Sequence, residues 1–219
     1  MLLGAVAALL PAMSFAQTAD TIPVQGAQEA RPMRAAAVPV ESYVAVYYVP
    51  INKLHGDGDT VSGDGGFGVA GLLAIGGGRM HPFLIADYQQ TDFKDFDQTV
   101  RNVRFGAGMQ FLPWLGAYAE YAQLKFDNSL DGLGLHVRFT PVAGPVSLMF
   151  QAGYLDLKNS HSGGSDADGA DFGIGAAMHF TPALSAMVDW RITVLSPKDG
   201  GDSLTLNDLR VGGRFDFGS

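Results

Sequence analysis

From residue 87 onward, arginine, aspartate and glutamate residues stand at alternate positions between apolar neighbours. The guanidinium group of arginine pairs with a carboxylate through two parallel hydrogen bonds, and it is more weakly hydrated than the ammonium group of lysine. An arginine–carboxylate set that contains no lysine therefore indicates an enclosed network of ion pairs. The members of this set are Asp87, Arg104, Glu120, Arg138, Asp171, Asp189, Arg191, Asp208, Arg210, Arg214 and Asp216.

One polar segment, SHSGGSDADG, could supply the nucleophile, general base and carboxylate of a hydrolase or an acyltransferase. The same segment is rich in Gly, Ser and Asp, which is typical of a solvated loop. We expect such a loop here and no enzymatic activity. The catalytic set would consist of His161, Ser160 or Ser162, and Asp166, Asp168 or Asp171.

Two acidic segments, HGDGDTVSGDGG and GGSDADGAD, offer oxygen ligands of the kind that calcium prefers. Neither segment has the ligand spacing of an EF-hand loop, so we expect no metal site and no cofactor. The absence of cysteine excludes disulfide bonds and thiolate metal ligands. The net charge of -8 argues against nucleic acid as a partner, because nucleic acid favours basic surfaces.

The elements that must position these residues are strands, which follow one another from Glu41 onward without a helical interruption. Brief connections such as LPW, TPVAG and TPA alternate with long polar ones such as KNSHSGGSDADG. Short turns at one end and long loops at the other are typical of up-and-down membrane barrels. We predict an all-β antiparallel transmembrane β-barrel with ten strands, or with eight as the alternative. The expected strands are 41–50, 65–76, 81–91, 97–111, 114–126, 131–140, 145–157, 169–181, 184–196 and 203–217.

Each expected strand has one apolar and one polar face. In the segment 169–181, for example, Phe172 and Ile174 share one side while Asp171 and Gly173 share the other. A soluble sandwich or barrel would bury the apolar face and expose the polar one, whereas a membrane barrel does the reverse. Lysine, which a solvated face would use freely, is found only in or beside the long connections. This distribution favours the membrane barrel, because a charge pointing into lipid at mid-membrane costs ~2–4 kcal/mol. The lysines are Lys53, Lys94, Lys125, Lys158 and Lys198.

The charges on the last two strands predict how these strands pair. If Asp189 lies opposite Arg210, then Arg191 lies opposite Asp208. A shift by two residues in either direction would place like charges opposite one another. Like charges in directly opposite positions are destabilising, whereas a pair of opposite charges stabilises the sheet by ~0.2–1 kcal/mol. The same register places Trp190 opposite Leu209, and Val188 opposite Val211, on the apolar side.

The N-terminal segment MLLGAVAALLPAMSFAQ has an apolar run followed by small residues before Gln17, which predicts a secretory signal peptide at residues 1–16. Residues 17–40 are rich in Ala, Pro and Gln without a clear period, and we expect a flexible leader on the periplasmic side. The barrel is expected at residues 41–217.

The chain resembles the small outer-membrane β-barrel superfamily of Gram-negative bacteria, the OmpA-like and OmpX-like single-domain, porin-family-like barrels. The resemblance rests on the final strand LRVGGRFDF, the pairs Asp87-Tyr88 and Glu120-Tyr121, and the signal peptide. It implies an outer-membrane location, with lipid, lipopolysaccharide and the barrel-assembly machinery as partners. In the family a terminal aromatic residue is read during assembly, but here Gly218 and Ser219 follow Phe217. The apolar side of the signal strand consists of Leu209, Val211, Phe215 and Phe217.

Three functions are compatible with such a barrel. The first is a non-enzymatic structural or surface-interaction role, favoured by an interior crowded with arginine–carboxylate pairs. The second is a narrow porin-type channel for water, ions or small solutes, because glycines facing the interior would leave room for water. The third, and least favoured, is a membrane-embedded hydrolase or acyltransferase. The inward-facing glycines are Gly66, Gly68, Gly106, Gly108, Gly173, Gly175 and Gly212.

Overall fold

The computed structural model describes residues 42–56, 58–78, 80–93, 98–126, 128–161 and 164–217. The expected signal peptide, the expected leader and Glu41 lie outside these ranges. Within the described ranges, no helix is long and apolar enough to span a membrane.

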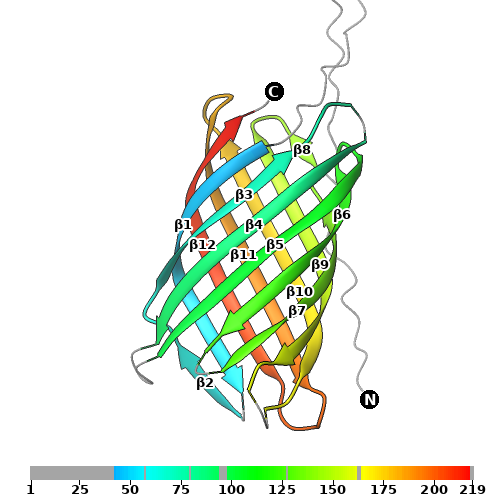
Figure 1. Ribbon diagram of the computed structural model, residues 1–219. Coiled ribbons are helices and arrows are strands. Elements are labelled where there is room, and N and C mark those ends of the chain that lie inside the picture. The colour runs from blue at the N-terminus through cyan, green and yellow to red at the C-terminus, as the bar shows by residue number, and fades with distance from the viewer. Residues whose placement is uncertain are drawn as a thin grey trace, which may run out of the picture. The chain divides into compact units, whose positions relative to one another are not determined.

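The described residues form strands that pair with their neighbours into one closed ring of ten strands (Figure 1). Around the ring the order is β1, β3, β4, β5, β6, β7, β9, β10, β11 and β12, and β12 pairs with β1 to close it. Two further short strands, β2 and β8, pair with β1 and β9. The strands are β1 (Ser42–Gly56), β2 (Asp59–Ser62), β3 (Gly66–Ala74), β4 (His81–Phe93), β5 (Gln98–Leu112), β6 (Leu115–Lys125), β7 (Ser129–Phe139), β8 (Val142–Ala143), β9 (Val146–Asn159), β10 (Ala167–His179), β11 (Leu184–Pro197) and β12 (Leu204–Phe217).

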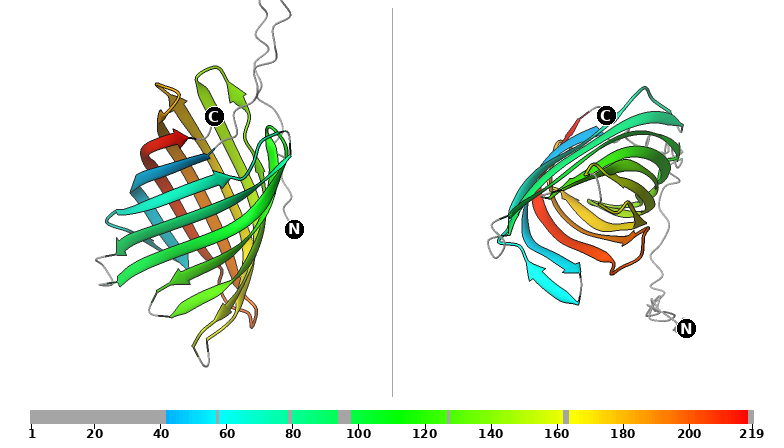
Figure 2. Two further views of the ribbon diagram at one scale, coloured as in Figure 1. Left: turned by 45° about the horizontal axis from the view of Figure 1, so that its top comes forward. Right: turned by 60° about the horizontal axis from the view of Figure 1, so that its bottom comes forward.

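All ring pairings are antiparallel, so the prediction of a ten-stranded up-and-down barrel is confirmed and the eight-stranded alternative is wrong. The tight turns lie at the upper end of Figure 1, together with the start of β1 and the end of β12, and we call this the short-turn end. The long connections and β2 lie at the opposite, long-loop end. Figure 2 shows β1 and β12 running side by side where the ring closes.

The first strand is longer than expected. The sequence predicted an end near residue 50, since proline cannot donate to a strand ladder. In the structure β1 continues to Gly56, because the pairing of β1 with β12 shifts register between Tyr48 and Ile51 and so accommodates Pro50. The residues expected to form a loop after Pro50 instead extend β1, which pairs with β2 in a small hairpin at the long-loop end.

The predicted register of the last two strands is confirmed. Asp189 lies opposite Arg210 and Arg191 lies opposite Asp208. On the other face of the same two strands, Trp190 pairs with Leu209 and Val188 pairs with Val211. The alternation of opposite charges therefore selected the correct pairing among those that the turn would allow.

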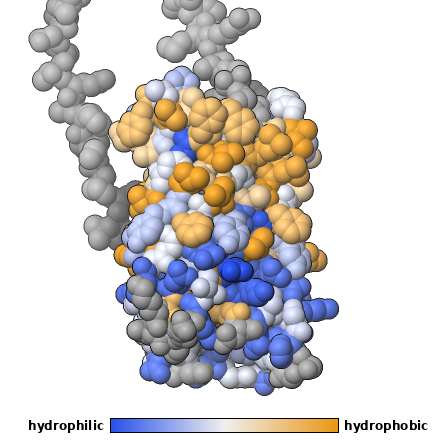
Figure 3. Space-filling model, turned by 60° about the vertical axis from the view of Figure 1, so that its left-hand side comes forward, coloured by the Kyte–Doolittle hydropathy of each residue, from blue (hydrophilic) through white to orange (hydrophobic). Residues whose placement is uncertain are grey.

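The outer face of the barrel is apolar along most of its height. Large apolar side chains are exposed on the ring strands β1, β3, β4, β5, β7, β9, β10, β11 and β12, among them Val46, Leu84, Phe105, Leu135 and Ile174. On the face that Figure 3 shows, hydrophobic residues form a broad band, and hydrophilic residues gather toward the long-loop end. The chain therefore has the inverted arrangement that the sequence predicted, with its greasy side outward.

Near the long-loop end the two faces exchange character. On β9 the outward residues change from Phe150 and Tyr154 to Asp156 and Lys158, all exposed. The inward residues change in the opposite sense, from Gln151 to leucine. Between the apolar band and the long-loop end, the barrel is thus built like a soluble one, with charges outside and leucines inside.

The interior at this end is a hydrophobic cluster, which corrects the expectation of a polar interior throughout. Leu155 and Leu157 are fully buried at its centre. The strands here stand in a polar exterior, so inward apolar side chains gain from leaving water. The cluster consists of Ala122, Leu124, Leu155, Leu157, Ala167, Leu195 and Leu206, with Leu54, Phe126, Leu130 and Leu204 packed against it.

Candidate functional site

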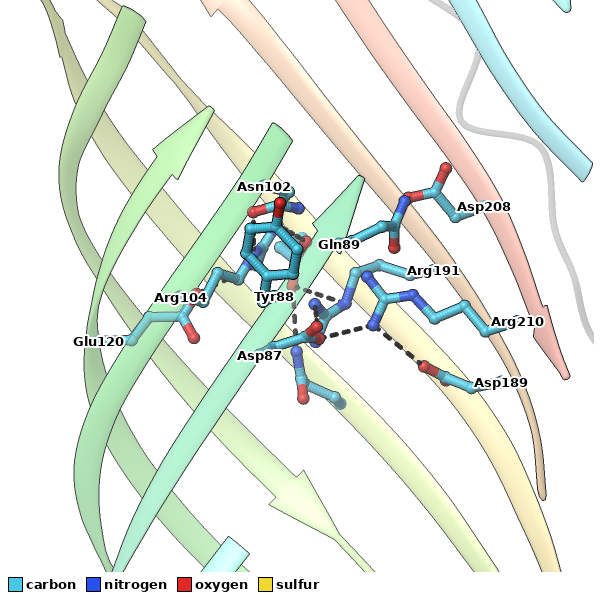
Figure 4. Close-up of polar contacts among 12 residues, drawn as sticks. Asp87, Tyr88, Gln89, Asn102, Arg104, Glu120, Asp189, Arg191, Asp208 and Arg210 are labelled. Carbon is cyan, nitrogen blue, oxygen red and sulfur yellow. Dashed lines mark hydrogen bonds and ion pairs between the residues drawn. The ribbon is translucent and has the colours of Figure 1, made fainter. Parts of the chain in front are cut away.

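A layer of ionised side chains crosses the barrel interior (Figure 4). It lies on the short-turn side of the leucine cluster. Arg104 on β5 donates to Glu120 on the neighbouring strand over 3.0 Å and to Asp171 on β10 over 3.1 Å. It also donates to the hydroxyl of Thr193 on β11 over 3.3 Å. Four ring strands separate β5 from β11 on either side, so this contact spans the full width of the barrel.

A second cross-barrel cluster surrounds Asp87 on β4. Its Oδ2 accepts hydrogen bonds from Arg191 on β11 over 3.2 Å and from Arg210 on β12 over 2.7 Å. Its Oδ1 accepts the hydroxyl of Tyr47 on β1 over 2.5 Å. Asp189 lies 3.7 Å from Arg210, so the ladder predicted from the sequence joins a larger network that reaches across the lumen.

Asp208 is held by amides rather than by its ladder partner Arg191. It accepts hydrogen bonds from Asn52 on β1 and from Gln89 on β4, the latter over 2.9 Å. Both amides are buried. The sequence missed them because an amide on a polar face does not reveal which carboxylate it will meet.

His136 on β7 lies within the charged layer. Its Nε2 lies 3.0 Å from Glu120 and its Nδ1 lies 3.8 Å from Asp171, while its ring stacks on Tyr118 at 4.8 Å. Gly153, directly opposite on β9, explains how the ring fits, because a side chain there would collide with the imidazole. A glycine directly opposite a large residue on the neighbouring strand is the sequence signal that could have located this histidine.

The remaining interior residues lie toward the short-turn end. Arg214 donates to Asp216 over 2.5 Å, and Asp216 in turn accepts the hydroxyl of Ser185 over 2.5 Å. His179 lies between two hydroxyls, with Ser185 2.8 Å from Nδ1 and Ser147 2.7 Å from Nε2. This chain of contacts joins β9, β10, β11 and β12 near their ends. Alternation along each strand indicates that these residues face inward, but it does not predict which of them meet.

Arg138 is buried and its guanidinium lies 5.9 Å from the ring centre of Tyr43, which Arg214 also covers at 4.0 Å. All the interior residues expected from the sequence are therefore found inside the barrel. They form two groups. The mid-height layer contains Asp87, Arg104, Glu120, Asp171, Asp189, Arg191, Asp208 and Arg210, and the group nearer the short-turn end contains Arg138, Arg214 and Asp216.

Large neighbours fill most of the space that the inward glycines were expected to leave open. The ring of Tyr47 covers Gly68, and Phe83 and Tyr118 cover Gly108. A cavity of about 70 Å³ does exist between the charged layer and the short-turn end, lined in part by Tyr43, Ser147 and Gly175. It has room for a few water molecules.

The Ser–His–Asp set in the loop after β9 does not assemble among the described residues. Ser160 donates to Asp131 over 2.6 Å, Asp168 accepts the hydroxyl of Tyr154 over 2.5 Å, and Asp171 is buried in the charged layer. Ser162 lies outside the described residues. No cluster of three or more His, Asp or Glu side chains with the geometry of a metal site occurs in the described ranges.

Outward aromatic residues mark the edge of the apolar band that faces the long-loop end. Tyr121 donates to Asp131 over 3.2 Å, and Trp190 donates to Asn207 over 2.5 Å. Tyr154 likewise reaches Asp168. Each ring lies against the apolar band while its polar atom reaches toward the long-loop end, which is how Tyr and Trp lie at a membrane–water interface.

Comparison with known proteins gives similarity of fold at low sequence identity. No protein-family model and no curated protein matches the chain. Among solved structures, Neisserial surface protein A is 14% identical, with 80% of this chain and 97% of that chain covered and a TM-score of 0.46. The attachment invasion locus protein Ail of Yersinia pestis is 11% identical, with 82% and 99% covered and a TM-score of 0.40.

An outer membrane channel from Pseudomonas putida F1 is 11% identical, with 86% of this chain and 100% of that chain covered and a TM-score of 0.44. These solved structures are outer-membrane barrels, and their names describe different roles. The assignment of this chain as a closed ten-stranded barrel stands on its own strand pairing.

Proposed function

We propose that this chain is an integral β-barrel of the bacterial outer membrane with a sealed interior and a non-enzymatic, structural or surface-interaction role. The single observation that carries the proposal is the inversion of the barrel. Ile174 and Phe172 are about half exposed on the outside, while Arg104, Asp171 and Arg210 are buried inside. In water this arrangement would be strongly unfavourable, whereas in a bilayer the outer side chains meet acyl chains.

The height of the apolar band supports a membrane location. On β10 and the residue after it, the outward positions from Ala170 to Phe180 carry no charge. Ten residue steps at ~3.3 Å give ~33 Å along the strand. With a strand tilt of ~40°, this becomes ~25 Å along the barrel axis, the height of the apolar band of outer-membrane barrels.

Two layers in the interior favour a sealed barrel over a channel. The charged layer crosses the lumen from β5 to β11, and the leucine cluster fills the interior nearer the long-loop end. The cavity of about 70 Å³ is the observation that favours the channel, but it lies on the short-turn side of both layers. A path for ions would require both layers to separate.

The proposed partners follow from this location. Lipid and lipopolysaccharide would surround the outer face, and the barrel-assembly machinery would read β12 through Leu209, Val211, Phe215 and Phe217. The outward aromatic pair Phe215 and Phe217, with ring centres 6.2 Å apart, ends that strand and supports such a role. The leader would lie in the periplasm, on the side of the short turns.

Conductance in a planar lipid bilayer tests the proposal. The purified barrel, refolded in detergent and shown to have entered vesicles by flotation, should give no discrete current steps at any applied voltage. Stable unitary steps that are absent from protein-free controls would favour the narrow channel instead. A chain that stays dissolved without detergent and does not float with vesicles would refute the membrane location itself.

A further inference from the structure

Two adjacent cations on the outer surface make no ion pair with any residue that the structure describes. Arg101 on β5 and Lys125 on β6 lie directly opposite one another, and both are exposed. Like charges in directly opposed positions are unfavourable on a sheet. Within the described part of the chain, neither side chain makes an ion pair or a side-chain hydrogen bond. Among the described residues, the fold thus holds two positive charges together without a carboxylate in contact with either of them.

Two outward carboxylates near the pair, among the residues that the structure describes, accept hydrogen bonds from hydroxyl groups. Asp92, diagonal to Arg101, accepts a hydrogen bond from Thr99 over 2.8 Å. Asp131, diagonal to Lys125, accepts from the hydroxyls of Tyr121 and Ser160. Neither of these two carboxylates makes an ion pair with Arg101 or Lys125.

Elsewhere at this level, cations do have acidic neighbours. Lys198 donates to Asp156 over 2.5 Å, and this hydrogen bond raises the pKa of Lys198 above its usual range. Lys158 lies directly opposite Asp131. The pair on β5 and β6 therefore differs from these lysines in its surroundings and not merely in its charge.

The height of the pair matches that of a lipid headgroup. Phe105 and Tyr121, with ring centres 5.2 Å apart, lie on the same two strands, four residues closer to the short-turn end. Four residues correspond to ~13 Å along the strand and, with a tilt of ~40°, to ~10 Å along the axis. Since Tyr and Trp rings lie at the edge of the acyl region, the two cations stand at the depth of the phosphates.

We propose that Arg101 and Lys125 bind the phosphate of a phosphorylated lipid headgroup in the membrane leaflet at the long-loop end. The planar guanidinium offers two parallel N–H groups to phosphate oxygens, and the ammonium adds a mobile point charge. The phosphate would supply the negative charge that the like-charged pair lacks. This inference rests on the proposed membrane location of the barrel.

The test compares the double variant Arg101→Gln/Lys125→Gln with the double variant Lys158→Gln/Lys198→Gln, which removes the same charge from the same level. Each barrel is refolded into vesicles of digalactosyl diacylglycerol, a lipid without phosphate, that contain diphosphorylated lipid A, its dephosphorylated form, or neither. Lipid A retained per barrel is counted by native mass spectrometry, and the midpoint of heat-modifiable gel mobility reports stability.

The wild type should retain diphosphorylated lipid A in preference to the dephosphorylated form, with a raised thermal midpoint. The Arg101/Lys125 variant should bind it about tenfold more weakly, a change of ~1.4 kcal/mol, because it loses its charge-assisted hydrogen bonds to the phosphate. The Lys158/Lys198 variant should bind like the wild type. Its equal loss would mean that total charge, and not this pair, attracts the lipid.

Two other outcomes would overturn the inference. Inorganic phosphate added to vesicles without lipid A should give no comparable stabilisation, and an equal effect would point to a free phosphate site. Insertion of the wild type into all vesicles without any dependence on lipid phosphate would remove the site while leaving the membrane barrel intact. Failure to enter any vesicle would remove both proposals.

Discussion

Single residues inside this barrel are stabilised by partners from several strands. Asp171 is fully buried, and it accepts hydrogen bonds from Arg104, Gln151 and Thr193. A buried ion pair need not stabilise a fold by itself, since desolvation offsets much of the attraction between the charges. Removing one partner is different, because the other charge then stays buried without compensation.

The substitution Asp171→Asn tests this argument. The amide keeps the shape of the side chain but removes the charge that faces Arg104, and breaking a buried pair in this way costs ~3–5 kcal/mol. We expect the urea midpoint of unfolding in detergent micelles, followed by tryptophan fluorescence, to fall accordingly.

Asp168→Asn is the matched control on the same strand. Asp168 faces outward and accepts the hydroxyl of Tyr154, which an amide oxygen can also accept. Its free energy of unfolding should change by less than about 1 kcal/mol. Equal losses for the two variants would indicate that the charged layer is hydrated and contributes little to stability.

At the residue scale the sequence predicted which side chains face inward but not which of them meet. Alternation within a strand is local, so it identified Asp87 and Arg104 as interior residues. Their partners come from strands up to half the ring away, as in the contact between Arg104 and Thr193. Tyr47 and His136, which complete the two clusters, carried no signal of their contacts in the local pattern.

At the scale of elements, each strand encodes its depth in the membrane. On β10 the outward positions run from Asp168 at the polar boundary to Ile174 and Phe172 in the apolar band. Period-two alternation sets the face of each residue, and the change from charged to apolar outward residues sets the height. Both are properties of the strand alone, but the sequence analysis predicted only the faces and not the height at which the outward residues change.

The substitution Ile174→Arg places a charge in the middle of the outer band. If acyl chains surround this position, the free energy of folding into vesicles should become less favourable by ~2–4 kcal/mol, as measured by equilibrium folding in urea. The control, Asp168→Arg at the polar boundary, should cost no more than ~1 kcal/mol. A soluble barrel would tolerate both substitutions alike, so indistinguishable values would argue against the bilayer.

At the scale of the whole molecule, two layers of different chemistry close the same lumen. The leucine cluster excludes water near the long-loop end, and the charged layer spans the lumen at mid-height. Either layer alone would obstruct a path along the axis. The barrel is therefore expected to remain closed when one of them is weakened.

The substitution Leu157→Ala examines this redundancy. Leu157 is fully buried, so its truncation leaves a cavity and should lower the free energy of unfolding by ~2–5 kcal/mol in a urea titration. The planar bilayer should stay electrically silent, because the charged layer on the short-turn side of the leucine cluster is intact. Current steps in this variant would contradict independent sealing by the two layers.

Leu133→Ala is the control for the cavity effect. Leu133 is 67% exposed on the outer face, where acyl chains can fill the space left by the truncated side chain. Only the transfer of fewer apolar atoms is then lost, so the cost should be smaller than for Leu157→Ala.

The sequence by itself determined the strands, their two faces, the ten-stranded ring and the pairing of β11 with β12. These follow from alternation, turn chemistry and the cost of opposing like charges, all of which act between residues close along the chain or across one hairpin. The tertiary structure alone decided the cross-lumen partners of Asp87 and Arg104 and the leucine cluster at the long-loop end. Those contacts depend on the width and curvature of the closed ring, which bring together strands that no local pattern relates.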